Sequence, residues 1–424
     1  MAPMRREIRF VIQHQCYWLK PQRTRGDSCA CFSCRRVRQR NGHECSVSLP
    51  PITIPTSLLP SDGRFGCGPS RIQPAAVAAL AEAASTYLGT SHRQPTVKAK
   101  VHDLLVGLQD LFQLPTGWEI VIGLGGSTVF WDVACFGLIH QRSQHLSFGE
   151  FSSKFAGCAQ AAPFLADPSV ILAPAGSHSV SIPEDGIDTY AQTHNETSTG
   201  VAMQLRRPRD SSGTPTDGLV LVDATSAAGG LRWDPAEVDV YYFAPQKCLA
   251  SDGGLWLACC SPAALERIAA IKASGRWIPA SLNLASCVEN SRLDQTINTP
   301  ALATVFLAEW QVRWVNEQGG LEWAASRCDE SAALLYGWAE KSAAATPFVA
   351  DPAQRSHVVG TVDIHDRIDA NVLSSMLRAN GIVDTASYRK LGRNQLRIAM
   401  FPATPPADVE ALTCCIDYIV DRLG

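Results

Sequence analysis

The sequence predicts an α/β fold, in which a mainly parallel, seven-stranded, doubly wound sheet is followed by a smaller C-terminal α+β domain. Two observations support this prediction. Up to about residue 300, short runs rich in β-branched and aromatic residues alternate with helical stretches. That alternation is typical of a parallel sheet with helices on both faces. Beyond this point long helical stretches dominate and only two strand-like runs remain.

Seven runs are predicted as the strands of the large sheet: residues 119–124, 145–151, 169–173, 188–195, 219–224, 240–246 and 255–260. Five helices are predicted around them, over residues 74–88, 96–112, 128–139, 152–161 and 262–273. Ser261 and Pro262 favour the start of the last helix, because serine can cap free backbone amides and proline fixes a helical φ angle.

The C-terminal part is predicted to contain helices over residues 301–317, 321–342, 369–379 and 408–423 and strands over residues 358–363 and 396–400. Loops are expected at residues 206–218 and 343–354, where no periodic pattern is present. We therefore expect a large domain over residues 51–318, a small domain over residues 319–424, and an extension, residues 1–50, before both.

The charge of the chain is unevenly distributed. Its 37 Lys and Arg residues face 40 Asp and Glu residues, a net charge of −3. Residues 1–50 contain ten of the basic and three of the acidic residues, a net of +7, which leaves 27 and 37 in the rest, a net of −10. An acidic body argues against a nucleic-acid-binding surface.

The composition is that of a globular protein, with 46% hydrophobic and 18% charged residues. No apolar run approaches the ~18 residues that a membrane span requires, so no membrane association is predicted. Ten of the fifteen cysteines follow residue 50, mostly in apolar surroundings. Such cysteines indicate reduced thiols in a cytoplasmic protein.

Residues 1–50 hold the other five cysteines. Cys29, Cys31 and Cys34, together with His43 and Cys45, offer ligands for zinc, but the second half lacks the paired spacing of a zinc site. We expect a disordered, Arg-rich extension instead, with no metal.

Reactive side chains are placed just beyond the predicted strands. In an open parallel sheet, ligands bind at the carboxyl ends of the strands. The residues at these ends are Gly126, Ser127 and Thr128 after the first strand, Phe151 at the end of the second, Thr197 after the fourth, Asp223 near the end of the fifth and Lys247 after the sixth.

An aspartate at one strand end, 24 residues before a lysine at the next, is the arrangement that pyridoxal phosphate requires. The cofactor's aldehyde needs an amine such as Lys247, whose pKa is lowered by desolvation. Its pyridine nitrogen stays protonated opposite a carboxylate such as Asp223. The phosphate would bind the amides of residues 126–128 at a helix N-terminus. A dinucleotide site is the alternative, but the glycines lack the GxGxxG spacing.

Residues 52–424 resemble phosphoserine aminotransferase, a fold-type I, class V enzyme that depends on pyridoxal phosphate. The motifs are Phe65-Gly66-Cys67-Gly68-Pro69-Ser70, Ser91-His92-Arg93, Gly126-Ser127-Thr128, Gly149-Glu150-Phe151, His194-Asn195-Glu196-Thr197-Ser198-Thr199-Gly200, Val222-Asp223-Ala224-Thr225, Ala244-Pro245-Gln246-Lys247, Asn298-Thr299-Pro300, and Arg389 with Arg397. The resemblance implies a homodimer that converts L-glutamate and 3-phosphohydroxypyruvate to O-phospho-L-serine and 2-oxoglutarate in L-serine biosynthesis.

The resemblance also implies a role for each matching residue. Lys247 would bind the cofactor's aldehyde and Asp223 its pyridine nitrogen. Phe151 would stack on the ring, at a position that is Trp in many relatives, and Thr197 would contact the 3-oxygen. The phosphate would be held by Gly126, Ser127, Thr128 and Gln246, with Asn298 and Thr299 from the second subunit.

For the substrate, the resemblance implies that Arg397 binds the α-carboxylate. His92, Arg93 and Arg389 would bind the phosphate or side-chain carboxylate. Tyr388 departs from the family, since many relatives have His at this position. The residue types agree with these roles, because arginine presents a fork that fits carboxylate and phosphate groups.

Three alternatives remain at this point. Another class V aminotransferase, such as one acting on alanine and glyoxylate, would share the fold, although His92 and Arg93 favour a dianionic substrate. A regulator that binds pyridoxal phosphate would need a helix-turn-helix, for which residues 1–50 lack the size and periodicity. A cysteine desulfurase would need a mobile, reactive thiol, and Cys248 and Cys328 are expected to be packed instead.

Overall fold

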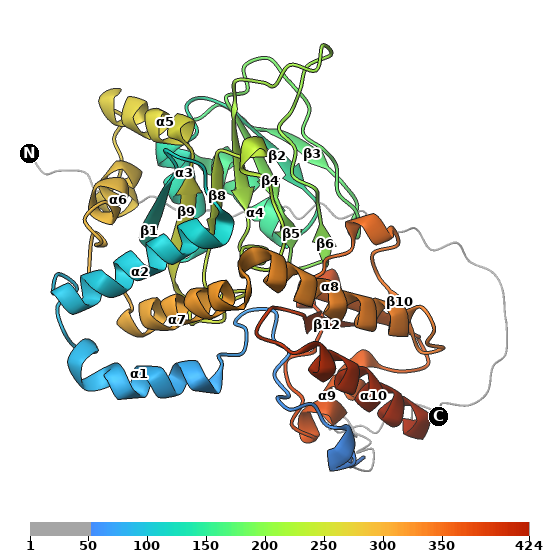
Figure 1. Cartoon of the computed structure of the whole chain (residues 1–424). Helices are drawn as coiled ribbons and strands as arrows, with labels where there is room; N and C mark the ends of the chain where they lie inside the picture. Colours follow the sequence, from blue (N-terminus) through green and yellow to red (C-terminus); the bar gives the residue numbers. More distant parts are fainter. Residues whose placement is uncertain (1–51, 424) are drawn as a thin grey trace, which may run out of the picture. The chain divides into compact units, whose positions relative to one another are not determined.

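The computed structural model describes residues 52–423, so the predicted extension and its cysteines lie outside the described residues. The chain builds a seven-stranded sheet in the order β1-β9-β8-β7-β4-β2-β3 (Figure 1). Its strands are β1 (Glu119–Gly125), β2 (Ser143–Ser147), β3 (Ser169–Leu172), β4 (Thr189–Thr193), β7 (Leu219–Asp223), β8 (Val240–Phe243) and β9 (Gly254–Cys260). Only β9 runs antiparallel to its neighbours. The predicted fold class is therefore confirmed.

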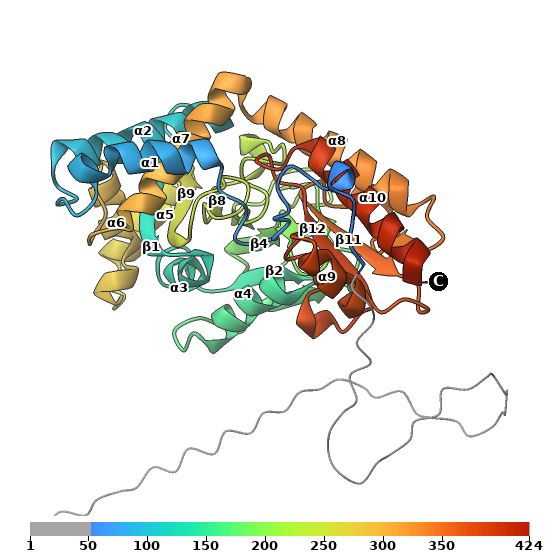
Figure 2. The same cartoon turned by 90° about the horizontal axis from the view of Figure 1, so that it is seen from below.

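Helices cover both faces of this sheet, as Figure 2 shows from below. They are α1 (Pro74–Tyr87), α2 (Pro95–Phe112), α3 (Ser127–Gly137), α4 (Glu150–Ala161), α5 (Pro262–Ala273), α6 (Leu284–Ser291) and α7 (Leu302–Gln318). Alternate residues of one strand enter different cores, because side chains of a strand point to opposite faces. On β7, Val220 and Val222 pack with α2 and α7, whereas Leu219 and Leu221 pack with α3 and α5.

The C-terminal part has its own three-stranded antiparallel sheet, β10-β11-β12. Its elements are α8 (Gly320–Ala339), β10 (Ala345–Pro347), β11 (Val359–Ile364), α9 (Ala370–Ala379), β12 (Gln395–Ala399) and α10 (Pro406–Leu423). Leu335, Leu373, Ile398 and Ile416 belong to one hydrophobic cluster around this sheet. The short strand β10 lies inside the predicted loop 343–354, where Pro347 and Pro352 interrupt any strand pattern.

Two predicted strands end at least three residues earlier than expected. The strand predicted over residues 145–151 ends at Ser147, and Phe151 is the second residue of α4. The strand predicted over residues 240–246 ends at Phe243, so Lys247 lies on the turn that follows. Pro245 explains the second difference, because proline has no N–H to continue a strand ladder.

No helix within residues 52–423 is long and apolar enough to cross a membrane. Over the same range there is no group of three or more His, Cys, Asp or Glu side chains that could hold a metal ion.

Candidate active site

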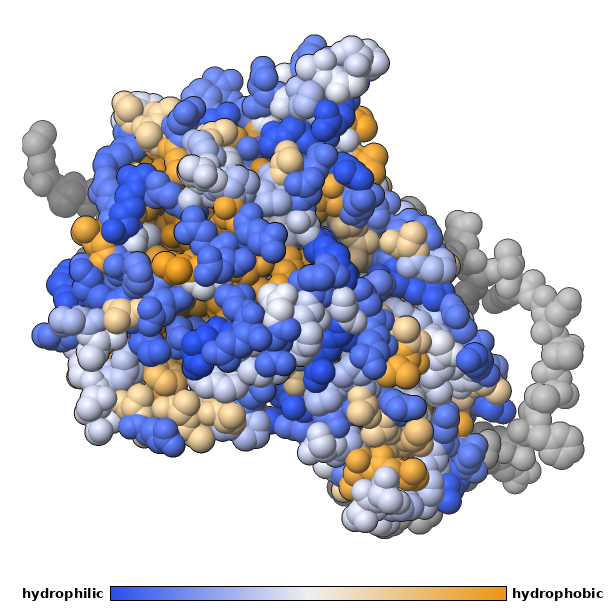
Figure 3. Space-filling view, in the orientation of Figure 1, coloured by the Kyte–Doolittle hydropathy of each residue, from blue (hydrophilic) through white to orange (hydrophobic). Residues whose placement is uncertain are grey.

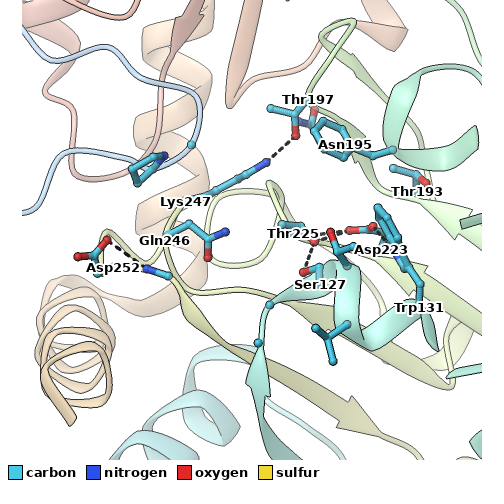
Figure 4. Close-up of a pocket in the computed structure, with 18 residues that line it drawn as sticks. Ser127, Trp131, Thr193, Asn195, Thr197, Asp223, Thr225, Gln246, Lys247 and Asp252 are labelled. Atoms are coloured by element: carbon cyan, nitrogen blue, oxygen red, sulfur yellow. Dashed lines mark hydrogen bonds between the residues drawn. The ribbon is translucent and has the colours of Figure 1, made fainter. Parts of the chain in front are cut away.

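A cavity of about 490 Å³ opens at the carboxyl ends of the parallel strands. It is lined by residues from β1, α3, β7, the turn after β8 and the N-terminal segment at Gly68 and Pro69. Lys247 and Asp223 reach into it from opposite sides (Figure 4). The sequence had predicted that strand ends bring these two residues together, and the structure does so.

The amine of Lys247 is buried, with only 7% of the residue exposed. Its Nζ donates a 2.9 Å hydrogen bond to Oγ1 of Thr197 and lies 5.2 Å from the centre of the Phe151 ring. Burial lowers the pKa of this amine below its ordinary value, although the charge of Asp223 acts in the opposite direction. Burial therefore favours the neutral amine, which is the nucleophilic form.

The carboxylate of Asp223 is held by two neighbours. Its Oδ1 accepts bonds from the backbone N–H of Thr225 at 3.0 Å and from the Thr225 hydroxyl at 2.6 Å. Its Oδ2 accepts a 3.3 Å bond from Nε1 of Trp131. The carboxylate keeps its orientation as a result, and it faces the cavity at the end of β7.

An anion cradle lies between β1 and α3. Gly125 and Gly126 have φ angles of 117° and 128°, a backbone region that side chains other than glycine's rarely adopt. The chain can therefore turn sharply and present the first amides of α3 to the cavity. Ser127, Thr128 and Gln246 also line this side, and Oε1 of Gln246 is buried without a hydrogen-bond partner among the described residues.

The Phe151 ring is positioned by a buried glutamate that the sequence did not reveal. Glu196, from β5 (Asn195–Glu196), accepts hydrogen bonds from the backbone N–H groups of Phe151 at 3.1 Å and Ser152 at 2.9 Å. A carboxylate at a helix N-terminus satisfies free N–H groups and opposes the positive end of the helix dipole. This contact starts α4 at Glu150 and explains why Phe151 is helical rather than part of a strand.

Neither Arg397 nor Arg389 is among the residues that line the cavity. Arg397 is half-buried on β12, and its Nη1 donates a 3.1 Å hydrogen bond to the carbonyl oxygen of Thr197. Arg389 is exposed and begins the short 3₁₀ helix η5 (Arg389–Leu391).

The remaining predicted residues form a separate group. Nδ1 of the buried His92 lies 3.1 Å from Oγ1 of Thr299, while Arg93 and Asn298 are exposed. None of these four residues lines the cavity of its own chain. The structure therefore joins the two segments that carry them but does not bring them to Lys247.

Trp131 and Thr225, which both contact Asp223, are further residues of the site whose roles the sequence did not indicate. Trp131 follows Ser127 by four residues, and residues at that spacing share one face of a helix. Thr225 follows Asp223 by two, the spacing at which an aspartate commonly accepts bonds from its own turn. Both signals were present, but only a known cavity makes either of them informative.

Two cysteines near the site are poorly suited to nucleophilic chemistry. Cys248 and Cys328 are both buried, and burial raises the pKa of each thiol. A raised pKa leaves little of the thiolate that reacts. This agrees with the expectation that both are packed side chains.

Comparisons with known proteins identify related sequences over nearly all of the described chain. The family described as Aminotransferase class-V matches residues 182–411. A phosphoserine aminotransferase of Nocardioides sp. is 59% identical over 373 residues, which cover 88% of this chain and 99% of the relative. A phosphoserine aminotransferase of Rhodococcus jostii is 56% identical over 378 residues, covering 89% and 100%.

Solved structures show the same fold. The structure of a phosphoserine aminotransferase from Cytophaga hutchinsonii has a TM-score of 0.76 to this chain, with 23% sequence identity. The similarity covers 86% of this chain and 99% of that one.

Proposed function

The chain belongs to the phosphoserine aminotransferase family of class V aminotransferases, and we propose from this membership and from the site that it makes O-phospho-L-serine. The amino group would pass from L-glutamate to 3-phosphohydroxypyruvate, with 2-oxoglutarate as the second product. This reaction belongs to L-serine biosynthesis. The observation that carries the proposal is the buried Lys247 amine opposite Asp223, beside an anion cradle in one cavity.

Enzymes of this family use pyridoxal 5′-phosphate, and the residues of the cavity fit this cofactor. An added Cβ at Gly126 would meet no atom within 4 Å, so the cradle has open space for a phosphate group. The unpartnered Oε1 of Gln246 lies at the same side. When bound, the cofactor supplies a protonated ring that withdraws electrons from the substrate's α-carbon.

We assign the cofactor contacts as follows. Lys247 would hold the cofactor at its aldehyde, and the Lys247 amine would carry the proton to and from the substrate's α-carbon. Asp223 holds the proton at the pyridine nitrogen, and Trp131 and Thr225 hold Asp223. Thr197 hydrogen-bonds the 3-oxygen, and Phe151 covers the ring.

The phosphate of the cofactor is assigned to the start of α3. The amides there and the side chains of Ser127 and Thr128 bind it, together with Gln246. Such a site needs no fixed cation, because the N-terminus of a helix already favours an anion.

The substrate's carboxylate and phosphate groups are assigned to arginines. Arg397 binds the α-carboxylate that both amino-acid substrates share, since its half-buried guanidinium borders the cavity through Thr197. Arg389 binds the phosphate or the side-chain carboxylate, together with His92 and Arg93.

We further propose that His92, Arg93, Asn298 and Thr299 act in the cavity of a second copy of the chain. His92 contacts Thr299, which joins the two segments that carry the four residues, and none of the four lines its own cavity. Hydrophobic side chains gather on the surface between α2 and α6 (Figure 3). Val106 on α2 and Leu293 just after α6 are large hydrophobic residues that are exposed in the single chain. A homodimer would cover this surface.

Two further assignments remain proposals. The chain divides into a large domain, residues 51–318, and a small domain, residues 319–424, with Ile54 and Phe65 of the first range packed in the hydrophobic cluster of the second. The enzyme works in the cytoplasm, which is supported by ten cysteines in the described chain that form no disulfide.

The function is tested by single half-reactions of the purified enzyme loaded with pyridoxal phosphate. O-phospho-L-serine, L-glutamate and L-alanine are each added in the absence of a keto acid, and the cofactor's visible absorbance is followed. We expect phosphoserine and glutamate to convert the cofactor to its amino form, and alanine to do so far more slowly. If alanine is as effective as phosphoserine, the enzyme is an aminotransferase of the alanine–glyoxylate type instead.

A further inference from the structure

Tyr388 lies on a loop that runs directly beside Arg397. The backbone N–H of Arg397 donates a 2.9 Å hydrogen bond to the carbonyl oxygen of Thr385, and Ala386 pairs with Leu396 as in an antiparallel strand. Backbone contacts between residues 385–386 and residues 396–397 therefore set the position of Tyr388 relative to Arg397.

The Tyr388 ring contacts two residues of the site. The guanidinium carbon of Arg397 lies 5.3 Å from the ring centre, within the range of a cation–π contact. The rings of Tyr388 and Phe151 are 6.0 Å apart and inclined by 59°. Tyr388 thus neighbours both the ring assigned to cover the cofactor and the arginine assigned to the substrate.

Arg397 has few other restraints within residues 52–423. Its Nη1 donates to the carbonyl of Thr197, and its Nε is buried without a hydrogen-bond partner there. A single hydrogen bond leaves a planar group free to rotate about that bond. The face of an aromatic ring removes this freedom and leaves the second N–H edge available for a carboxylate.

The loop that carries Tyr388 is also attached to α4 by an ion pair. Nζ of Lys390 lies 2.5 Å from Oε1 of Glu150, the residue before Phe151. Burial raises the pKa of Glu150, but hydrogen bonds from Lys390 and Lys154 outweigh this and hold the pKa below its ordinary value. The loop is consequently tied to α4 on both sides of Arg389.

We propose that Tyr388 is a positioning residue, whose ring holds the Arg397 guanidinium in the orientation that binds the substrate α-carboxylate. This rests on the proposed function, because that function assigns the α-carboxylate to Arg397. L-glutamate and O-phospho-L-serine share this carboxylate, so Tyr388 acts equally on both substrates. A residue that contacted the phosphate of phosphoserine but not the side-chain carboxylate of glutamate would act on phosphoserine alone.

The test compares three variants by steady-state kinetics with both amino acids. Tyr388→Leu removes the ring, Tyr388→Phe keeps it, and Tyr418→Leu is the matched control. Tyr418 makes an equivalent contact with Arg422 on α10, at 3.3 Å from the guanidinium carbon to the ring centre. Tyr388→Leu should raise KM for both substrates by the same factor, on the order of tenfold for one desolvated cation–π contact. Tyr388→Phe and Tyr418→Leu should stay within twofold of the wild type in KM and kcat.

A double-mutant cycle shows whether Tyr388 acts through Arg397. Arg397→Lys keeps the charge but removes the planar fork. If the proposal holds, adding Tyr388→Leu to Arg397→Lys produces little further increase in KM. Independent, multiplying effects of the two substitutions would overturn it, as would a KM that rises for phosphoserine alone.

A binding measurement separates this inference from the proposed function. Glutarate carries two carboxylates but neither an amino nor a keto group, so it binds without reacting. Calorimetry on the loaded enzyme should give a Kd for glutarate that rises in Tyr388→Leu by the same factor as the KM values. An unchanged Kd would overturn the role of Tyr388 even in an active enzyme. A wild type that binds glutarate but transaminates neither amino acid would contradict the function instead.

Discussion

Nε1 of Trp131 donates a 3.3 Å hydrogen bond to Oδ2 of Asp223. The bond joins α3, whose first residues form the anion cradle, to the end of β7, which carries the carboxylate. One helix therefore positions both the phosphate site and the group that faces the pyridine nitrogen. Because α3 is a rigid element, the position of the phosphate site and the orientation of the Asp223 carboxylate depend on each other.

The first prediction concerns this bond. Trp131→Phe removes the N–H but keeps an aromatic ring against Phe155, and Thr225 still holds Asp223. Loss of one ordinary hydrogen bond should lower kcat by about fivefold, corresponding to ~1 kcal/mol. Asp223→Asn removes the charge itself and should lower kcat by on the order of 10²-fold or more. Equal effects of the two substitutions in a kinetic comparison would show that Trp131 does more than orient Asp223.

The second prediction concerns pH. Burial lowers the pKa of the Lys247 amine from its ordinary 10.5, Asp223 raises it and Arg397 lowers it. Only the neutral amine takes up the cofactor, so uptake by the apoenzyme should become faster as pH rises, with a midpoint below 10.5. Asp223→Asn should move this midpoint to lower pH, and Arg397→Gln should move it to higher pH. Stopped-flow measurements across a pH series give the midpoint, and shifts of the opposite sign would refute the assignment.

The third prediction concerns stability and uses two glycines. Gly123 on β1 is paired with Trp256 on β9, and an added Cβ there would overlap the indole ring. Gly123→Ala should therefore lower the free energy of unfolding by ~1–3 kcal/mol or more. Gly157 lies on the exposed side of α4, where an added Cβ meets no atom within 4 Å. Gly157→Ala should raise the free energy of unfolding by ~0.5–1 kcal/mol. Urea denaturation of both variants checks the sign of each change.

The fourth prediction concerns the N-terminal extension. The relative from Rhodococcus jostii is matched over 100% of its length by 89% of this chain. That relative therefore folds without a counterpart of the unmatched residues of this chain. A chain that lacks residues 1–45 should keep the kcat and melting temperature of the full chain. A loss of activity above tenfold would assign a role to the cysteines or the basic residues of this segment.

The strand ends could be predicted from the sequence because they depend on local patterns. Runs of Leu and Val and of aromatic residues fix β7 and β8, and Asp223 and Lys247 follow from the ends of these strands. Parallel strands then bring both residues to the same edge of the sheet, whatever the rest of the chain does.

The position of Phe151 could not be predicted in this way. The start of α4 depends on the carboxylate of Glu196, which is 45 residues away in the chain. Long-range caps of this kind leave no local signal, and the apolar run before Gly149 continued the strand pattern. The group formed by His92 and Thr299 is a second case, since their contact spans 207 residues.

The most direct test of the account is the identity of the lysine that binds the cofactor. The enzyme loaded with pyridoxal phosphate is reduced with borohydride, which fixes the cofactor on the amine, and peptides are mapped by mass spectrometry. The account predicts a single modified peptide that contains Lys247, and no modification in Lys247→Ala. A protein that binds no cofactor, or one that carries it on another lysine, would contradict the assignment of the cavity.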